Sequence, residues 1–263
     1  MNLAGRTALV TGATGGLGQA IARALVRRGA SVVLTGRRAD VLEPLAEETG
    51  GRALECDLSD REALLRLVDD AGPVDVLVAN AGTPASGRIE TFTLDQIDRA
   101  IDVNLRAPMM LARLMCEGMS ERGGGHIVFM SSLSGKAGTV RTSIYSATKF
   151  GLRGFAQGLR ADLESHGVGV STVMPGFIRD AGMFHEAGAK LPAYVGTKTP
   201  EDVAQAVISA IEDNRAEVDV APIALRLGTT FAAFAPETAA AVQRRLGADD
   251  LASQMETGQR GKR

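Results

Sequence analysis

Short runs of apolar and β-branched residues alternate along this chain with longer segments of helical periodicity. The run ValAspValLeuValAla at 74–79 is almost continuously apolar, which is typical of a strand buried on both faces of a parallel sheet. Strand–helix–strand repetition at this spacing predicts parallel strands joined by right-handed crossovers. We therefore expect an α/β fold, a doubly wound parallel sheet of about seven strands with helices on both faces.

The same patterns predict the individual elements and one domain over 1–263. Strands are expected at 7–11, 31–35, 52–56, 74–79, 126–131, 169–174 and 217–220. Helices are expected at 16–28, after Ser59 and Asp60, and at 94–121, 143–165 and 200–214. Residues 181–199 have little periodicity and are expected to form a mobile substrate lid, and 222–263 to form a helical extension with a solvated polar tail.

Composition excludes several classes of function. The 263 residues carry a formal net charge of −2, which argues against non-specific nucleic-acid binding. The two cysteines, Cys56 and Cys116, are too few for a disulfide framework or a zinc site, so no metal site is expected. The N-terminal residues lack the long apolar stretch of a signal peptide, so none is expected, and no apolar run reaches the roughly 20 residues needed for a membrane span. We expect a cytoplasmic protein.

A glycine-rich turn follows the first predicted strand and leads into a helix. It reads ThrGlyAlaThrGlyGlyLeuGly at 11–18, with Gly12, Gly16 and Gly18 in the spacing G-x-x-x-G-x-G. Glycine permits a tight turn and a close approach of backbone N–H groups to a pyrophosphate, which the helix N-terminus also attracts. No Lys-Ser/Thr pair follows, so a P-loop is not expected. A glycine-rich turn required only for packing remains an alternative.

The end of the second predicted strand indicates the form of the dinucleotide. An acid at this place accepts from the ribose 2′-hydroxyl in NAD sites, whereas an Arg accommodates a 2′-phosphate. Here Gly36 is followed by Arg37 and Arg38, and two guanidinium groups can bind a phosphate in bidentate fashion. The sequence therefore predicts that NADP(H) is preferred over NAD(H). The alternative is a solvated basic start to the next helix.

Tyr145 and Lys149 are four residues apart in a predicted helix, which places both side chains on one face. An ammonium about 4 Å from a phenol contributes roughly 4 kcal/mol at an effective dielectric of about 20. That is about three pKa units, enough to bring the phenol near neutrality for proton exchange with an alcohol oxygen. Ser132, at the end of a neighbouring strand, can donate to the same oxygen. A surface Tyr–Lys pair is the alternative reading.

These residues stand in order among further motifs. Asp57 follows the third strand, AsnAlaGly lies at 80–82, Asn104 at the centre of a long helix, and ProGly at 175–176. Together with the glycine-rich turn, Ser132 and TyrSerAlaThrLys at 145–149, they make the chain resemble the single-domain branch of the short-chain dehydrogenase/reductase family over about residues 5–220. The resemblance implies a Rossmann-like fold.

The resemblance also implies a role for each motif. Tyr145 would be the general acid/base, Lys149 would lower its pKa and bind the nicotinamide ribose, and Ser132 would orient the carbonyl. Asn104 would hold a water that relays protons to Lys149, and Asp57 would bind the adenine amino group. The implied cofactor-binding residues are Gly12, Thr14, Gly16, Leu17, Gly18, Arg37, Arg38, Asp57, Leu58, Asn80, Ala81, Gly82, Tyr145, Lys149, Pro175, Gly176 and Ile178.

One position departs from the family pattern. Asp180 stands where the family usually has a Thr that binds the nicotinamide carboxamide. An ionised carboxylate can accept a hydrogen bond from that carboxamide but cannot donate one.

The expected activity is hydride transfer with NADP(H), reducing a carbonyl to a secondary alcohol or the reverse. The alternatives are a sugar-nucleotide epimerase or dehydratase, and a non-catalytic NADP-binding sensor or scaffold. Apolar residues of the lid, among them Met183, Phe184 and Tyr194, indicate a small-molecule substrate with an apolar body. The resemblance implies a homodimer or homotetramer formed through the helices at 94–121 and 143–165. The apolar stretch after Pro222 could complete the substrate pocket, form an oligomer contact or approach a lipid surface.

Overall fold

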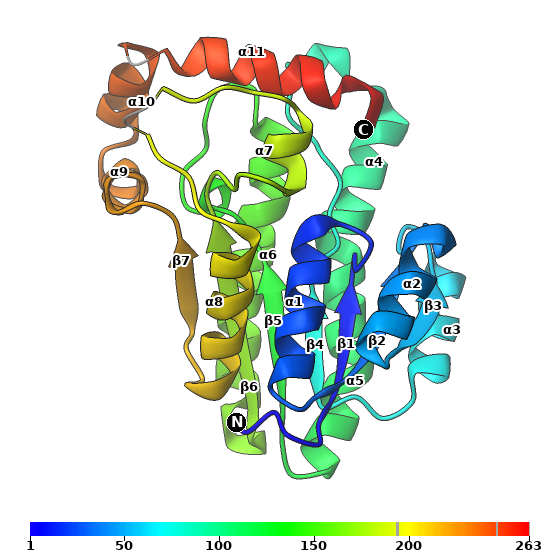
Figure 1. The fold of residues 1–263 in the computed structure, drawn as a ribbon. Helices are drawn as coiled ribbons and strands as arrows, with labels where there is room; N and C mark the ends of the chain where they lie inside the picture. Colours follow the sequence, from blue (N-terminus) through cyan, green and yellow to red (C-terminus); the bar gives the residue numbers. More distant parts are fainter. Residues whose placement is uncertain (193–194, 246, 263) are drawn as a thin grey trace.

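The fold is built on a parallel sheet (Figure 1), in a computed structural model that describes residues 1–192, 195–245 and 247–262. The sheet has seven parallel strands in the order β3-β2-β1-β4-β5-β6-β7. The strands are β1 (Thr7–Thr11), β2 (Ser31–Gly36), β3 (Arg52–Glu55), β4 (Val76–Ala79), β5 (Gly125–Met130), β6 (Val168–Pro175) and β7 (Glu217–Val220). The predicted fold class is confirmed, and each predicted strand lies within two residues of the observed one.

Helices cover both faces of this sheet. The helices are α1 (Gly16–Arg27), α2 (Ala39–Thr49), α3 (Arg61–Ala71), α4 (Leu94–Ile101), α5 (Ala107–Glu121), α6 (Ser143–Leu163), α7 (Gly182–Glu186), α8 (Pro200–Glu212), α9 (Ile223–Phe234), α10 (Pro236–Arg245) and α11 (Ala248–Gln259). Short 3-10 turns are η1 (Ile89–Thr91), η3 (Leu133–Gly135), η4 (Glu164–His166) and η5 (Arg260–Lys262). In Figure 1, α1 and α8 lie in front of the sheet, while α5 and α6 lie behind it.

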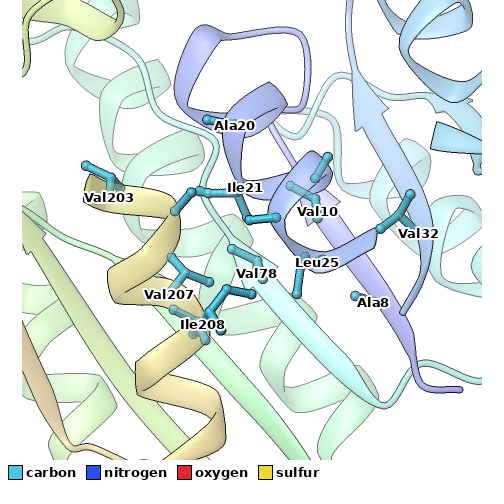
Figure 2. Packing of buried hydrophobic residues seen from close by; sticks show 14 of the residues in the cluster. Ala8, Val10, Ala20, Ile21, Leu25, Val32, Val78, Val203, Val207 and Ile208 are labelled. Atoms are coloured by element: carbon cyan, nitrogen blue, oxygen red, sulfur yellow. The ribbon is translucent and has the colours of Figure 1, made fainter. Parts of the chain in front are cut away.

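Two apolar cores, one on each face, hold these layers together. Figure 2 shows one of them, in which Ile21 and Leu25 of α1 interdigitate with Val207 of α8 above β1 and β4. On the opposite face, α3, α5 and α6 pack on the sheet around the fully buried Phe129. Burial on both faces explains why the strands are apolar almost without interruption.

A π-helical turn interrupts the predicted helix at 94–121. The turn, η2 (Asp102–Arg106), separates α4 from α5. Pro108 lies in the first turn of α5, and it has no N–H to donate to the Asn104 carbonyl four residues earlier. The predicted bounds of this helical segment are confirmed, and the π-helical turn within it, which periodicity does not predict, falls at Asn104, a candidate site residue.

The segment after β7 is helical, as expected. Residues 260–262 of its tail are exposed, as predicted, but the end of α11 before them is partly buried. Glu256 and Gln259 are 6% and 2% exposed, because the end of α11 packs on α7. By contrast, α9 carries exposed apolar side chains, with Ile223 72% and Phe234 85% exposed. Within the described parts of the chain, no helix has the length and apolar content needed to traverse a bilayer.

A buried histidine is expected to make this fold sensitive to acid. Burial, reinforced by nearby positive charge that includes Arg160, lowers the pKa of His126 from 6.5 to about 3. The unfolded chain therefore binds a proton as the pH falls through 6.5, while the folded chain does not until about 3, so stability is lost across that window. Relative to His126→Gln, the wild type should lose on the order of 1.4 kcal/mol of unfolding free energy per pH unit. Urea denaturation at several pH values measures this difference; parallel curves for the two proteins would contradict it.

Candidate active site

A cleft of about 750 Å³ opens at the carboxyl ends of the strands, where the strand order reverses between β1 and β4. Ligands of doubly wound sheets bind at this place, and the volume lies within the range of small-molecule sites. All the predicted cofactor-binding residues line the cleft, from Gly12 in the glycine-rich turn to Ile178 after β6, and Ser132 lines it too. Topology therefore gathers motifs that are far apart in the sequence.

The glycine-rich turn offers N–H donors to this cleft. Gly12 has φ +64°, and a Cβ there would lie 2.7 Å from the Cα of Ala81. Among the described residues no side chain caps α1, whose first turn has no acid. Its free N–H groups and the positive end of the helix dipole face the cleft through Gly16 and Leu17. This cradle fits a pyrophosphate.

The edge of the cleft above β2 is basic. Arg37 and Arg38 are exposed and line it, and Arg38 Nη2 donates to the carbonyl of Thr14, 2.6 Å away. The hydroxyl of Thr35 beside them is buried and has no hydrogen-bond partner among the described residues. A buried hydroxyl without a partner is costly, so this end of the cleft has polar capacity left for a ligand.

Asp57 is held by two neighbours at the same end. Its carboxylate accepts from the Ser59 hydroxyl at 2.7 Å and forms an ion pair with Arg99 at 3.1 Å. Burial acts to raise the pKa of Asp57, but the hydrogen bonds from Ser59 and Arg99 outweigh it and lower that pKa to about 2. The carboxylate is thus ionised and fixed in orientation.

Tyr145 and Lys149 lie on one face of α6 and point into the cleft with Ser132, which follows β5. The Lys149 ammonium lies 5.7 Å from the centre of the Tyr145 ring. It donates to the carbonyl of Met130 at 2.8 Å and is 3% exposed. The Ser132 hydroxyl accepts from the N–H of Ser134 at 3.1 Å, which holds it at the end of β5. The three side chains converge on one wall.

The pKa values differ from the expected ones. Burial raises the pKa of Tyr145 to about 12, although a hydrogen bond with Ser132 acts in the opposite direction. Burial also lowers the pKa of Lys149 to about 8. The expectation that Lys149 brings the phenol near neutrality is therefore wrong for this arrangement, because desolvation dominates and the ammonium is directed at a backbone carbonyl. The phenol is protonated at neutral pH.

Asn104 lies behind this wall instead of lining the cleft. It is fully buried, its Oδ1 accepts from the N–H of Thr83 at 2.7 Å, and its Nδ2 donates to the Thr83 carbonyl at 3.0 Å. A Cβ on Gly82 would lie 3.2 Å from Asn104 Oδ1 and 3.8 Å from Lys149 Nζ. The amide thus stands close to the lysine, and the water relay implied by the resemblance stays a prediction.

The amino-terminal part of the predicted lid lines the cleft. Met183 and Phe184 of α7 line the cleft, and the Phe184 ring lies 5.1 Å from that of Phe177. Asp180 does not line it; its side chain is 68% exposed and pairs with Arg179 at 3.5 Å. Tyr194 lies outside the described residues.

Several lining residues carry no sequence signal for this site. They are Thr35, Cys56, Thr83, Pro84, Arg99 and Lys262. Arg99 belongs to an ordinary amphipathic helix, and Lys262 belongs to a tail that reads as solvated. Both reach the cleft through contacts between segments far apart in sequence, which no local motif marks.

The fold and the cleft together define a class, the oxidoreductases that bind a nicotinamide dinucleotide on a doubly wound sheet. A family model described as short chain dehydrogenase matches residues 6–192. The chain belongs to this family.

Individual relatives agree with this assignment. The ketoacyl reductase HetN of Nostoc sp. (strain PCC 7120) is 39% identical over 227 residues, which cover 83% of this chain and 79% of that protein. The 3-oxoacyl-[acyl-carrier-protein] reductase FabG of Rickettsia conorii is 33% identical over 222 residues, 81% of this chain and 92% of its own. A solved short-chain dehydrogenase from Sphingobium yanoikuyae in complex with NADPH has a TM-score of 0.75 at 28% identity, covering 89% of this chain and 95% of that one.

Proposed function

We propose that the protein is a carbonyl reductase that uses NADPH and forms a secondary alcohol, with the reverse oxidation also possible. The observation that carries this proposal is the convergence of Ser132, Tyr145 and Lys149 on the cleft that holds the glycine-rich turn. When bound, the reduced nicotinamide supplies a hydride to the carbonyl carbon. The ketoacyl reductases among the relatives support a carbonyl substrate.

The chain's own residues would supply the proton. The Tyr145 hydroxyl, protonated because burial raises its pKa to about 12, is suited to donate to the oxygen as negative charge develops there. Ser132 would hold that oxygen by donating a second hydrogen bond. Lys149 is buried beside the ring and would resupply the proton, with Asn104 behind it. In the reverse oxidation the Tyr145 phenolate would accept the proton from the alcohol.

The pH profile of reduction should carry the signature of Lys149. Since burial lowers the pKa of Lys149 from 10.5 to about 8, its ammonium is present below that pH and lost above it. We expect kcat/KM for reduction to fall as the pH rises through about 8. The slower Lys149→Arg variant should show no such fall, because a guanidinium does not deprotonate. Stopped-flow rates from pH 6 to 10 test this. If both proteins lose rate in the same way as the pH rises, a group other than Lys149 causes the loss.

NADP(H) is the proposed cofactor, in preference to NAD(H). Arg37 and Arg38 line the cleft beside the end of β2, where a 2′-phosphate would lie in such folds. The NADPH complex of the Sphingobium relative supports this choice. Asp57, fixed by Arg99, would accept from the adenine amino group.

The substrate proposal is a small carbonyl compound with an apolar body, because Met183 and Phe184 line the cleft and Phe177 packs on the Phe184 ring. A panel of ketones and secondary alcohols, with NADPH consumption as the readout, tests this. Tight NADPH binding without turnover of any member would favour a sensor, and epimerisation or dehydration of a sugar nucleotide would favour the other alternative.

We further propose that residues 1–263 act as one domain in a cytoplasmic homodimer or homotetramer. Leu114 of α5 and Phe150 of α6 are 37% and 42% exposed, which suits a contact through these two helices. Light scattering would measure the assembly, and a monomer would contradict it.

A further inference from the structure

The last described helix crosses the open end of the cleft. Figure 1 shows α11 running across the carboxyl edge of the sheet directly above α7. The helix α11 and the residues after it contact three separate segments: α7, the loop after β4 at Thr83, and the loop before α6 at Arg141. Of these segments, α7 and the loop after β4 line the cleft.

The closest of these contacts depends on a glycine. A Cβ on Gly258 of α11 would lie 2.6 Å from the Cα of Ala187, at the end of α7. That neighbour is backbone and cannot move aside without displacing α7. Gly261, three residues later, has nothing within 4 Å of such an atom. A side chain at 258 would therefore displace α7, whereas a side chain at 261 would meet no other atom of the described residues.

Polar contacts also hold α11 and the residues after it against the neighbouring segments. Lys262 Nζ pairs with Glu186 at 2.9 Å, and both side chains line the cleft. Arg141, in the loop before α6, pairs with the buried Glu256 at 2.9 Å. The N–H of Lys190 donates to Gln254 Oε1 at 2.9 Å.

The segment held in this way lies across the cofactor cradle. A Cβ on Gly16 would lie 2.5 Å from the Cβ of Ala181, and one on Gly182 would lie 3.6 Å from Leu17. The Met183 methyl group lies 3.3 Å from the corresponding position on Gly82, beside Lys149. The helix α7 therefore lies between α11 and the cofactor cradle.

We infer that 258–262 form a clasp that holds α7 over the cleft, and that Lys262 and Glu186 thereby determine which molecules enter. Both side chains are about half exposed, at 46% and 47%, so their pairing is weak enough to open and close. The inference deepens the proposed function, which supplies only the identity of the entering molecules, NADPH and a carbonyl substrate.

A matched pair of glycine variants tests the clasp. In Gly258→Ala the new methyl group should push α11 off α7, and amide exchange in 182–187 should accelerate about tenfold or more. The association rate of NADPH should rise by a similar factor, and so should the ratio of kcat/KM for a bulky aryl ketone to that for a small methyl ketone. Gly261→Ala, which adds the same methyl group in open space, should match the parent in every measurement.

A charge exchange tests the role of the ion pair. Glu186→Lys and Lys262→Glu each bring like charges together and should accelerate exchange in α7 two- to fivefold, as suits a half-exposed pair. The double variant restores opposite charges and should return to the parent rate. A loss of local packing alone would not be rescued in this way.

The outcomes separate this inference from the proposed function. Equal exchange in the two glycine variants would overturn the clasp, as would faster exchange with an unchanged NADPH association rate or, where substrates turn over, unchanged selectivity between ketones. If the parent does not bind NADPH, the proposed function fails, and entry of this cofactor past the clasp fails with it. If the parent binds NADPH without turning over any carbonyl, hydrogen exchange and the association rate still decide the clasp.

Discussion

Replacing Tyr145 by Phe should lower turnover by a factor of about 10² to 10⁴, the usual contribution of a general acid. The variant removes one hydroxyl and retains the ring that lies 5.7 Å from the Lys149 ammonium. The affinity for NADPH should change by less than about threefold, because the glycine-rich turn and the basic edge of the cleft are unaltered. Steady-state kinetics on the best ketone of the panel, together with NADPH fluorescence titration, measures both quantities.

Ser132→Ala provides a graded comparison for this variant. It removes the second hydrogen bond to the substrate oxygen but leaves the proton donor, so a smaller loss of turnover is expected. If Tyr145→Phe keeps more than about a tenth of the parent turnover, Tyr145 does not donate the proton and the proposed chemistry is wrong.

Replacing Arg37 by Asp should weaken NADPH binding about 10- to 100-fold while leaving NADH binding unchanged or slightly stronger. A charge-assisted hydrogen bond contributes about 1.5–3 kcal/mol, and an acid at this position would repel the 2′-phosphate. Arg37 is exposed at the edge of the cleft, so its replacement should not disturb the core. Fluorescence titration with both cofactors measures the change in preference.

Arg244→Asp is the matched control for charge. Arg244 lies exposed near the end of α10 and outside the lining of the cleft, so the variant changes the net charge equally. If both variants weaken NADPH binding to the same extent, the effect comes from overall charge and not from contact with the 2′-phosphate. An unchanged NADPH affinity in Arg37→Asp would contradict the proposed cofactor preference.

Much of the fold follows from short-range patterns. Nearly continuous apolar runs such as that ending at Ala79 are typical of strands buried on both faces, as in a parallel sheet with helices on each side. Several helix starts were equally clear; Asp60, for example, was predicted before a helix and caps α3 by accepting from the N–H groups of Glu62 and Ala63. The bounds of the helix at 94–121 were predicted as well, but the π-helical turn within it was not, because periodicity does not show the effect of the backbone N–H that Pro108 lacks.

The candidate site, like the fold, combines features that the local sequence predicts with features that depend on tertiary contacts. The sequence by itself determined the glycine-rich turn, the Tyr145–Lys149 face and the basic pair at Arg37, because each is a short pattern whose geometry the local backbone dictates. Tertiary structure alone decided the ionised Asp57 against Arg99, the protonated Tyr145 and the docking of Lys262 on Glu186. Desolvation and ion pairing depend on which distant segments pack together, and a one-dimensional pattern does not contain that information.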